Sequence, residues 1–178
     1  LILQASKDFY VSFRVQSQNH AEILVPKGRT ALGTSFRVGS LPQLYDSAIR
    51  NFVTSFMATE DNTTVNVSDY GSGVTFITPS GTTTVTSQTF TLNKGQSYII
   101  DGIGNITGNF DGFIGAKIVS DKPVNVTNGN FNGQYAGNFA TSSDILMDQA
   151  VPVERLGNEF ALVKGNGTLT SNMEGALV

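Results

Sequence analysis

The sequence predicts an all-β protein, an antiparallel β-sandwich, from three observations. Charged residues make up only 14% of the chain, and much of its polarity comes from threonine, asparagine, serine and glycine, which favour strands and turns. Short runs that alternate apolar and polar residues recur at close spacing, separated by Gly, Pro and Asn. No amphipathic run long enough for a crossover helix lies between them, which argues against a βαβ fold.

The 178 residues are enough for one domain with a substantial core. We predict a β-sandwich domain over residues 1–156. Residues 157–178 are predicted to begin a second β lobe of a two-lobed repeat, or to add a terminal strand to the first. The second lobe rests on an internal similarity, because residues 7–12 (KDFYVS) and 158–163 (NEFALV) both place an acid and a Phe before an apolar run. A chance match between two strands is the alternative. We expect the chain to be a fragment of a longer protein.

The centre of the fold is predicted to be a hairpin within residues 90–130. Residues 114–119 alternate with a period of two, as a half-buried strand does, and residues 124–127 form a second β-rich run. The sequence SDKP at 120–123 has strong turn character, because Pro fixes φ while Ser and Asp bond to nearby backbone donors.

The first part of the chain has the most regular alternation. Residues 7–15 (KDFYVSFRV) are predicted to be the clearest strand, with one face made of Phe9, Val11, Phe13 and Val15. Further strands are predicted at 21–25 and 30–38. Residues 44–50 hold either a helical turn or a connecting loop.

Residues 51–59 (NFVTSFMAT) are apolar on both faces, which predicts a central strand that is covered on two sides. The turn residues EDN that follow predict that residues 63–68 pair back on this strand as a hairpin arm. Three more strands are predicted at 73–78, 82–92 and 96–101, separated by the turns PSG and NKG.

Two long loops, 102–112 and 129–143, are rich in Gly, Asn and aromatic residues. Loops of this length are uncommon unless they are functional or disordered. The candidate ligand contacts are therefore the loop aromatics Phe110, Phe131, Tyr135 and Phe139. The alternative is that these aromatics cap the open end of the sandwich.

The sequence offers little for catalysis. His20 is the only histidine, no Ser lies in a GxSxG motif, and a zinc site is nearly excluded without Cys. Asp101 and Asp111 lie in Gly-rich turns, but the DxDxDG spacing of a calcium loop is missing. We predict no catalytic residue, no cofactor and no metal site, and hence no enzyme. A hydrolytic alternative would require Asp101, Asp111, Asp144 and Asp148 in one cleft.

Charge and hydropathy exclude two classes of partner. The net charge is −3 and no basic cluster is present, which argues against nucleic acid. No apolar run approaches the roughly 20 residues that a membrane-spanning helix needs.

Five blocks of sequence resemble a known family: KDFYVSFR, NFVTSFMATEDNTTVNVS, FTLNKGQSYII, GAKIVSDKPVNVTNGN and DQAVPVERLGNEFALV. In this order, over residues 7–163, they resemble the N-terminal domain family of IgGFc-binding protein, and SDKPV at 120–124 is the most specific block. The family is common in very large bacterial surface proteins, notably Bacteroidetes adhesins exported by the type IX secretion system and linked to gliding motility. The absence of Cys and the richness in Asn and Thr fit that branch better than the disulfide-rich animal one.

The resemblance implies a non-enzymatic β-sandwich module of a large secreted adhesin on the bacterial outer surface, acting as a scaffold or a ligand-contact domain. The implied partners are other domains of the same chain, the secretion machinery, and surface glycans or proteins. A carbohydrate-active domain, or one that binds glycans or immunoglobulin, is the alternative. The family pattern carries no catalytic residue, and its name does not show that this chain binds immunoglobulin.

Overall fold

The computed structural model describes residues 3–43, 47–134, 143–163 and 165, and within these ranges the regular structure is β-strand and short 3₁₀ turn. The strands are β1 (Phe13–Ser17), β2 (His20–Leu24), β3 (Gly33–Arg37), β4 (Asn51–Ala58), β5 (Thr63–Ser68), β6 (Phe76–Thr78), β7 (Gly81–Thr83), β8 (Gln88–Leu92), β9 (Ser97–Ile103), β10 (Lys117–Gly133) and β11 (Asp144–Gln149). The 3₁₀ turns are η1 (Gly28–Ala31), η2 (Thr107–Asn109) and η3 (Val153–Arg155). The predicted all-β fold is confirmed.

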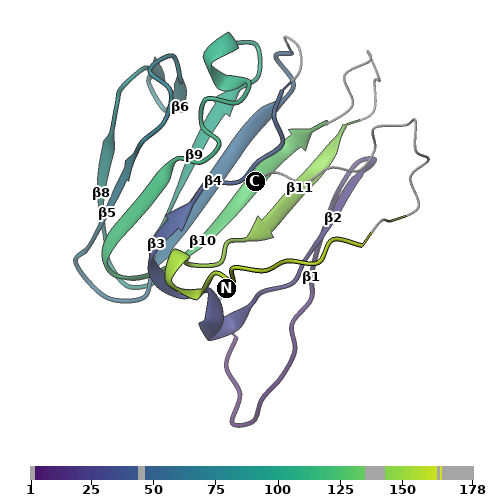
Figure 1. Ribbon diagram of the computed structural model, residues 1–178, viewed down its shortest axis with the longest axis vertical. Coiled ribbons are helices and arrows are strands. Elements are labelled where there is room, and N and C mark those ends of the chain that lie inside the picture. Colours follow the sequence, from purple (N-terminus) through teal and green to yellow (C-terminus); the bar gives the residue numbers. More distant parts are fainter. Residues whose placement is uncertain (1–2, 44–46, 135–142, 164, 166–178) are drawn as a thin grey trace.

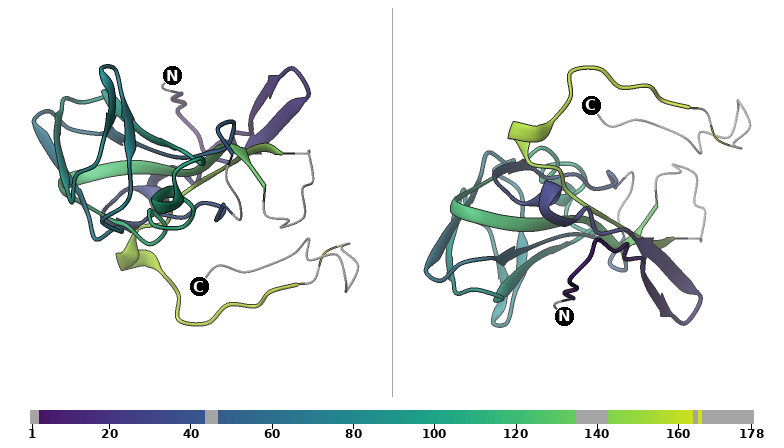
Figure 2. Two further views of the ribbon diagram at one scale, coloured as in Figure 1. Left: turned by 90° about the horizontal axis from the view of Figure 1, so that it is seen from above. Right: turned by 90° about the horizontal axis from the view of Figure 1, so that it is seen from below.

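A seven-stranded antiparallel sheet forms the body of the domain (Figure 1). Its order is β8-β5-β10-β4-β9, and β3 and β11 also pair with β10. The sheet curls over at its β5–β8 side, as the views along the strands show (Figure 2), and encloses the core as a nearly closed sandwich. The strand pairs β1–β2 and β6–β7 form two small separate sheets.

Strand β10 corrects the predicted central hairpin. Residues 117–133 form one continuous strand of 17 residues, not two strands joined by a turn. Its first part pairs with β3 and β5 on its two edges, and its second part pairs with β11 and β4. The turn-like sequence SDKP lies where the pairing changes from β5 to β4, so it bends the strand and does not reverse it. Pro123 is tolerated there because no strand pair is formed between Ser120 and Val124.

The predicted hairpin arm at 63–68 is also wrong. Strands β4 and β5 follow one another along the same edge of β10, where Ala58 pairs with Val124 and Val65 pairs with Ser120. Strands β9 and β8 lie along β4 and β5 in the same way. The chain is therefore bent at 59–62 and at 93–96, beside the bend in β10.

Polar side chains tie the three bends together. The Asp61 carboxylate accepts a hydrogen bond from the backbone N–H of Lys94 at 3.0 Å, and the Asn93 side chain accepts one from the N–H of Asn62 at 3.1 Å. The Lys122 ammonium donates to the carbonyls of Asp61 and Asn62. The Asp121 carboxylate accepts from the backbone of β5. These bonds satisfy backbone groups that no strand pairing reaches.

The inner face of the curled sheet is packed with aromatic and branched side chains. The largest fully buried residues include Phe36, Phe56, Phe76, Phe113 and Ile118. Phe56 of β4 lies 5.3 Å from Phe90 of β8, measured between ring centroids, so the two sides of the curled sheet pack on each other. Burial of this apolar surface is the main force that holds the sandwich together.

Most other strand predictions agree with the structure to within a few residues. The predicted strands at 21–25, 51–59 and 96–101 correspond to β2, β4 and β9. The predicted strand at 30–38 is shortened to β3 by the turn η1. The strand at 73–78 is reduced to β6, and the strand at 82–92 is divided into β7 and β8. Of the ambiguous segment 44–50, only 47–50 are described, and they form a turn.

Residues 7–12 do not belong to the strand predicted there. Only Phe13 and the residues after it pair, in β1, and residues 3–12 form no hydrogen bond within the described part of the chain. Phe9 is 53% exposed and Tyr10 is 74% exposed, so the alternating face is not covered. Residues 129–133, predicted as loop, belong to β10. Residues 157–163 are extended and exposed, and the assignment of 157–178 to a second lobe or a terminal strand stays a prediction.

Candidate binding site

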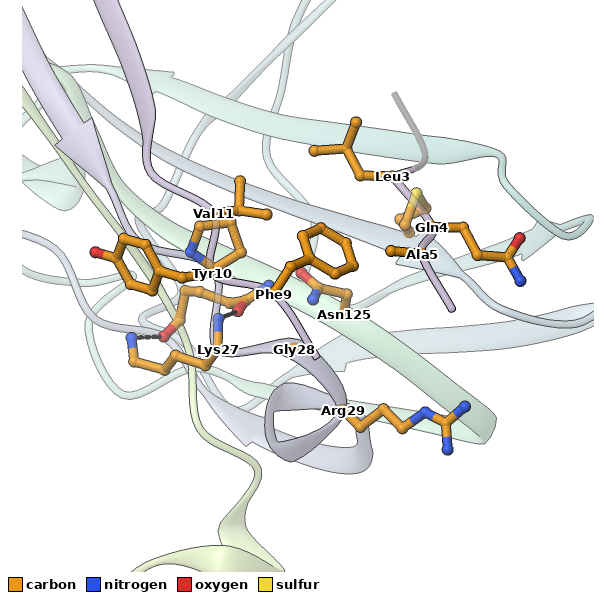
Figure 3. A pocket seen from close by; sticks show the side chains of 13 residues that line it. Leu3, Gln4, Ala5, Phe9, Tyr10, Val11, Lys27, Gly28, Arg29 and Asn125 are labelled. Atoms are coloured by element: carbon orange, nitrogen blue, oxygen red, sulfur yellow. Dashed lines mark hydrogen bonds between the residues drawn. The ribbon is translucent and has the colours of Figure 1, made fainter. Parts of the chain in front are cut away.

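A hollow on the surface lies between the N-terminal segment and the outer face of the sheet (Figure 3). We call it the N-terminal pocket. Its volume is about 690 Å³, and its walls are residues 3–5, 9–11 and 26–29, with Met57, Asn125 and Gln149 as the floor. These residues come from six different parts of the chain, so the pocket exists only in the folded domain.

The floor is formed by alternation within β4 and β10. Phe56 and Ala58 of β4 point into the core, so Met57 between them points outward. Val124 and Val126 of β10 are fully buried, so Asn125 points to the same outer face as its partner Met57. The outer face of the sheet therefore presents a thioether and an amide side by side.

The wall at 26–29 is held against β11 by Lys27. Its backbone N–H donates to the Gln149 side chain, and its ammonium donates to the Gln149 carbonyl and to the Asp148 carboxylate, the latter at 2.6 Å. The Thr30 hydroxyl donates to the Lys27 carbonyl and stabilises the turn η1. The wall is thus fixed by hydrogen bonds, whereas the opposite wall at 3–11 carries the apolar side chains.

The pocket combines apolar and positively charged groups. The lining side chains Leu3, Phe9, Tyr10, Val11 and Pro26 are apolar or aromatic. Lys27 and Arg29 are the charged members, and no carboxylate is among the described residues of the lining. Lys27 is paired with Asp148, but Arg29 forms no ion pair within the described ranges and extends away from the other labelled residues (Figure 3). Arg29 therefore places one positive charge at the rim of the pocket, near the exposed rings of Phe9 and Tyr10.

Of the four predicted contact residues, the structure describes two. Phe110 is half-buried just after η2, and its carbonyl accepts a hydrogen bond from the N–H of Gln43. Phe131 is 43% exposed on β10. Both lie at the end of the sandwich where β4 begins, far along the strand from the N-terminal pocket. Tyr135 and Phe139 lie outside the described residues, and ligand contact by all four stays a prediction.

The predicted acidic residues are dispersed over different elements. Asp101 lies on β9, where burial raises the pKa of its carboxyl group although the Asn51 amide donates to it at 3.0 Å. Asp111 follows η2, and Asp144 and Asp148 lie on β11. Within the described ranges, no group of three or more His, Cys, Asp or Glu side chains is placed to hold a metal ion. The hydrolytic alternative therefore lacks the cleft that it requires in this part of the chain.

His20 is paired with Asp144 at 3.5 Å, in a surface contact between β2 and β11. Hydrogen bonds from the backbone N–H groups of Ile145 and Ala21, together with nearby His20, lower the pKa of Asp144. The Glu22 carboxylate accepts a further bond from the N–H of Met147. These groups attach the β1–β2 hairpin to the edge of the main sheet, which is a structural role.

Sequence reasoning missed the N-terminal pocket. The alternation in residues 7–15 predicts a strand, whereas in the structure Phe9 and Val11 precede β1 and line a surface hollow. The one available signal was that Phe9 and Tyr10 place large rings on both faces of a single segment, which is unusual for a strand with one solvated face.

Fold and site together define a β-sandwich domain that displays an open, partly aromatic surface site. The sequence profile of the family described as IgGFc binding protein matches residues 20–176, and the chain belongs to this family. The matched range includes the floor of the N-terminal pocket and its wall at 26–29, but not the wall at 3–11. No significant match was found among curated proteins or among solved structures. In the described part of the chain, no helix has the length and apolar character needed to cross a membrane.

Proposed function

We propose that this chain is a non-enzymatic binding module of a large secreted adhesin, exposed on the bacterial outer surface, with the N-terminal pocket as its ligand-contact site. Membership of a family described by binding supports the general role. The gliding and type IX context rests on the family resemblance, the lack of Cys and the Asn- and Thr-rich composition. Its partners would be other domains of the same chain, the secretion machinery, and surface glycans or proteins.

The observation that carries the proposal is the exposure of Phe9 and Tyr10 at a pocket that also holds Arg29. Exposed aromatic rings with an arginine are typical of residues that dominate protein interfaces. The apolar side chains of the wall at 3–11 exclude water around the contact, and Arg29 favours an anionic group on the ligand. The packed sandwich and the Lys27 hydrogen bonds fix the floor and the wall at 26–29 in advance, which lowers the entropic cost of binding.

The test is binding of the isolated chain to immunoglobulin Fc, to a glycan array and to extracted surface proteins, with immobilised chain and biolayer interferometry. Phe9→Ala with Tyr10→Ala, and separately Arg29→Ala, should weaken retention by at least about tenfold. Ile77→Ala is the matched control, since Ile77 is also exposed but lies on β6.

Three outcomes separate the parts of the proposal. Loss of binding in the pocket variants alone supports both the function and the site. Equal binding by all variants would show that the ligand contacts lie elsewhere on the domain, and the binding role would still be supported. No retention of any of the three ligand classes by the unmodified chain would contradict a contact role and leave a spacer.

A further inference from the structure

Two segments of the described chain carry exposed apolar side chains and belong to no strand. Residues 7–12 and 157–163 form no hydrogen bond within the described part of the chain. Phe9, Phe160 and Leu162 are 53%, 73% and 78% exposed, although such side chains gain free energy when buried. Backbone that lacks strand partners and carries apolar side chains can pair with a strand of another chain.

The two segments match each other in pattern. In 7–12 (KDFYVS) the odd positions Phe9 and Val11 form one face, and in 158–163 (NEFALV) the even positions Phe160 and Leu162 form one face. In each segment an acid precedes the Phe, on the opposite face. A pair of such strands can therefore join two apolar faces into one continuous surface.

The segments lie on opposite faces of the sheet within one chain. Residues 3–11 border the pocket that contains Asn125, whereas Leu156 borders a hollow that contains Asn128. Asn125 and Asn128 are three residues apart on β10, so they point to opposite faces. Figure 2 shows the N-terminal end and the stretch after η3 on opposite sides of the sheet in both views. Within one copy the two described segments are therefore not paired with each other.

We propose that residues 158–163 of one copy add as an antiparallel strand to residues 7–12 of a second copy and join the copies head to tail. The antiparallel direction places Phe160 opposite Val11 and Leu162 opposite Phe9, which are favourable aromatic and aliphatic cross-strand pairs. It also places Glu159 opposite Ser12. A parallel, in-register pair would instead place Glu159 beside Asp8, and like charges opposite each other are unfavourable.

The proposed contact is heterologous, because it uses a different surface on each copy. Two copies joined in this way still present one unused segment at each end, so further copies can be added. Association should therefore progress from dimers to longer chains as concentration rises. Phe9, Tyr10 and Val11 also line the N-terminal pocket, so self-assembly would compete with a ligand of that pocket. It is therefore measured without any ligand.

The test is sedimentation velocity of the full chain over a wide range of concentration. Phe160→Ser with Leu162→Ser removes the donor strand, and Phe9→Ser with Val11→Ser removes the acceptor strand. Each double variant should weaken self-association by at least about a hundredfold, since each loses two apolar contacts. A 1:1 mixture of the two variants should still form dimers and no larger species, because it holds one intact donor and one intact acceptor. Ile99→Ser, at an exposed position on β9, is the control and should associate like the unmodified chain.

A disulfide provides a second measurement, which does not depend on affinity. The chain has no Cys, so Val11→Cys and Phe160→Cys introduce unique thiols. Mixed and oxidised, the two single variants should form a covalent heterodimer, while Ile99→Cys mixed with Phe160→Cys should not. A chain that is monomeric at every concentration and forms no cross-link would overturn the proposal. So would protection of 158–163 from hydrogen exchange in a monomer, which would place this strand in a lobe of its own chain. Circular dichroism of each variant verifies that the fold is intact.

Discussion

Replacement of Asn109 is expected to loosen the end of the sandwich that carries the loop 104–116. Asn109 is 3% exposed. Its side chain forms the hydrogen bonds with the Thr75 backbone that a neighbouring strand would otherwise form. The Asn109 Oδ1 accepts from the N–H of Thr75 at 2.8 Å, and Nδ2 donates to the carbonyls of Thr75 at 2.8 Å and Ile103 at 2.9 Å. Asn109→Ala removes all three bonds and leaves three backbone groups without a partner.

The magnitude follows from these three groups. A buried polar group without a partner costs about 1–3 kcal/mol, and Thr75 and Ile103 are partly exposed, so water offsets some of the loss. We expect Asn109→Ala to lower the free energy of unfolding by about 2–4 kcal/mol. For a domain of this size, this corresponds to a fall in Tm of roughly 4–16 °C.

Urea denaturation followed by circular dichroism, with a thermal melt in parallel, measures both quantities. Asn105→Ala is the control, because Asn105 is exposed in the same loop and should change stability by less than about 0.5 kcal/mol. Equal stability of the two variants would show that the Asn109 bonds contribute nothing net, and would refute the reasoning.

Asn109→Asp refines the test through pH. The buried carboxyl group would face two carbonyls, so its pKa in the folded state should be raised above the unfolded value. The variant should then be closest to the unmodified chain in stability below about pH 4, and the difference should grow as pH rises through the folded pKa. A difference that does not depend on pH would contradict this account of the site.

Two further predictions concern the sheet. Gly129 has φ +150°, and a Cβ there would lie 1.8 Å from the Leu146 carbonyl oxygen. Gly129→Ala should therefore separate β10 from β11 and lower the free energy of unfolding by several kcal/mol in urea titrations. Gly39→Ala is the control, because a Cβ at Gly39 meets nothing within 4 Å and should be nearly neutral. Burial raises the pKa of Asp101 in the folded protein. The contribution of the Asp101 carboxyl group to stability is therefore most favourable below its unfolded pKa and is lost as pH rises through its folded pKa. Asp101→Asn should therefore raise Tm relative to the unmodified chain more at pH 7 than at pH 3.5, and an equal shift at both values would contradict the burial of this group.

The strands that the sequence predicts well are those whose pattern depends only on local burial. Residues 51–58 form β4 in the interior of the sheet, between β10 and β9, which is the central position that an apolar run of this kind predicts. The strand at 7–15 was predicted from equally regular alternation and is largely absent. Alternation describes which face could be buried, but Phe9 becomes part of a strand only if another segment covers it, and the sequence does not contain that information.

The two wrong hairpins share one physical cause. The sequences EDN at 60–62 and SDKP at 120–123 contain residues that form hydrogen bonds with backbone N–H groups or lack an N–H group. Such residues are needed both where the chain reverses in a hairpin and where a strand only bends. Whether the chain forms a hairpin or a bend depends on whether the next strand pairs with the previous strand or both pair with a third strand, here β10. Val65 pairs with Ser120 across 55 positions of sequence, and no local signal reports such a partner.

The same bends explain why the candidate site could not be found from the sequence. Met57 and Asn125 lie next to the bends in β4 and β10, at the point where the sheet turns from its curled side to its flatter side. There the outer face contributes the Met57 and Asn125 side chains to the floor of the N-terminal pocket, close to both bends. If the Lys122 ammonium, which donates to the Asp61 and Asn62 carbonyls, holds these two bends together, then removing it should disturb the pocket without touching its lining. A loss of ligand binding in Lys122→Ala, with the fold intact, would tie the site to the bend, and unchanged binding would show that the floor is set by strand pairing alone.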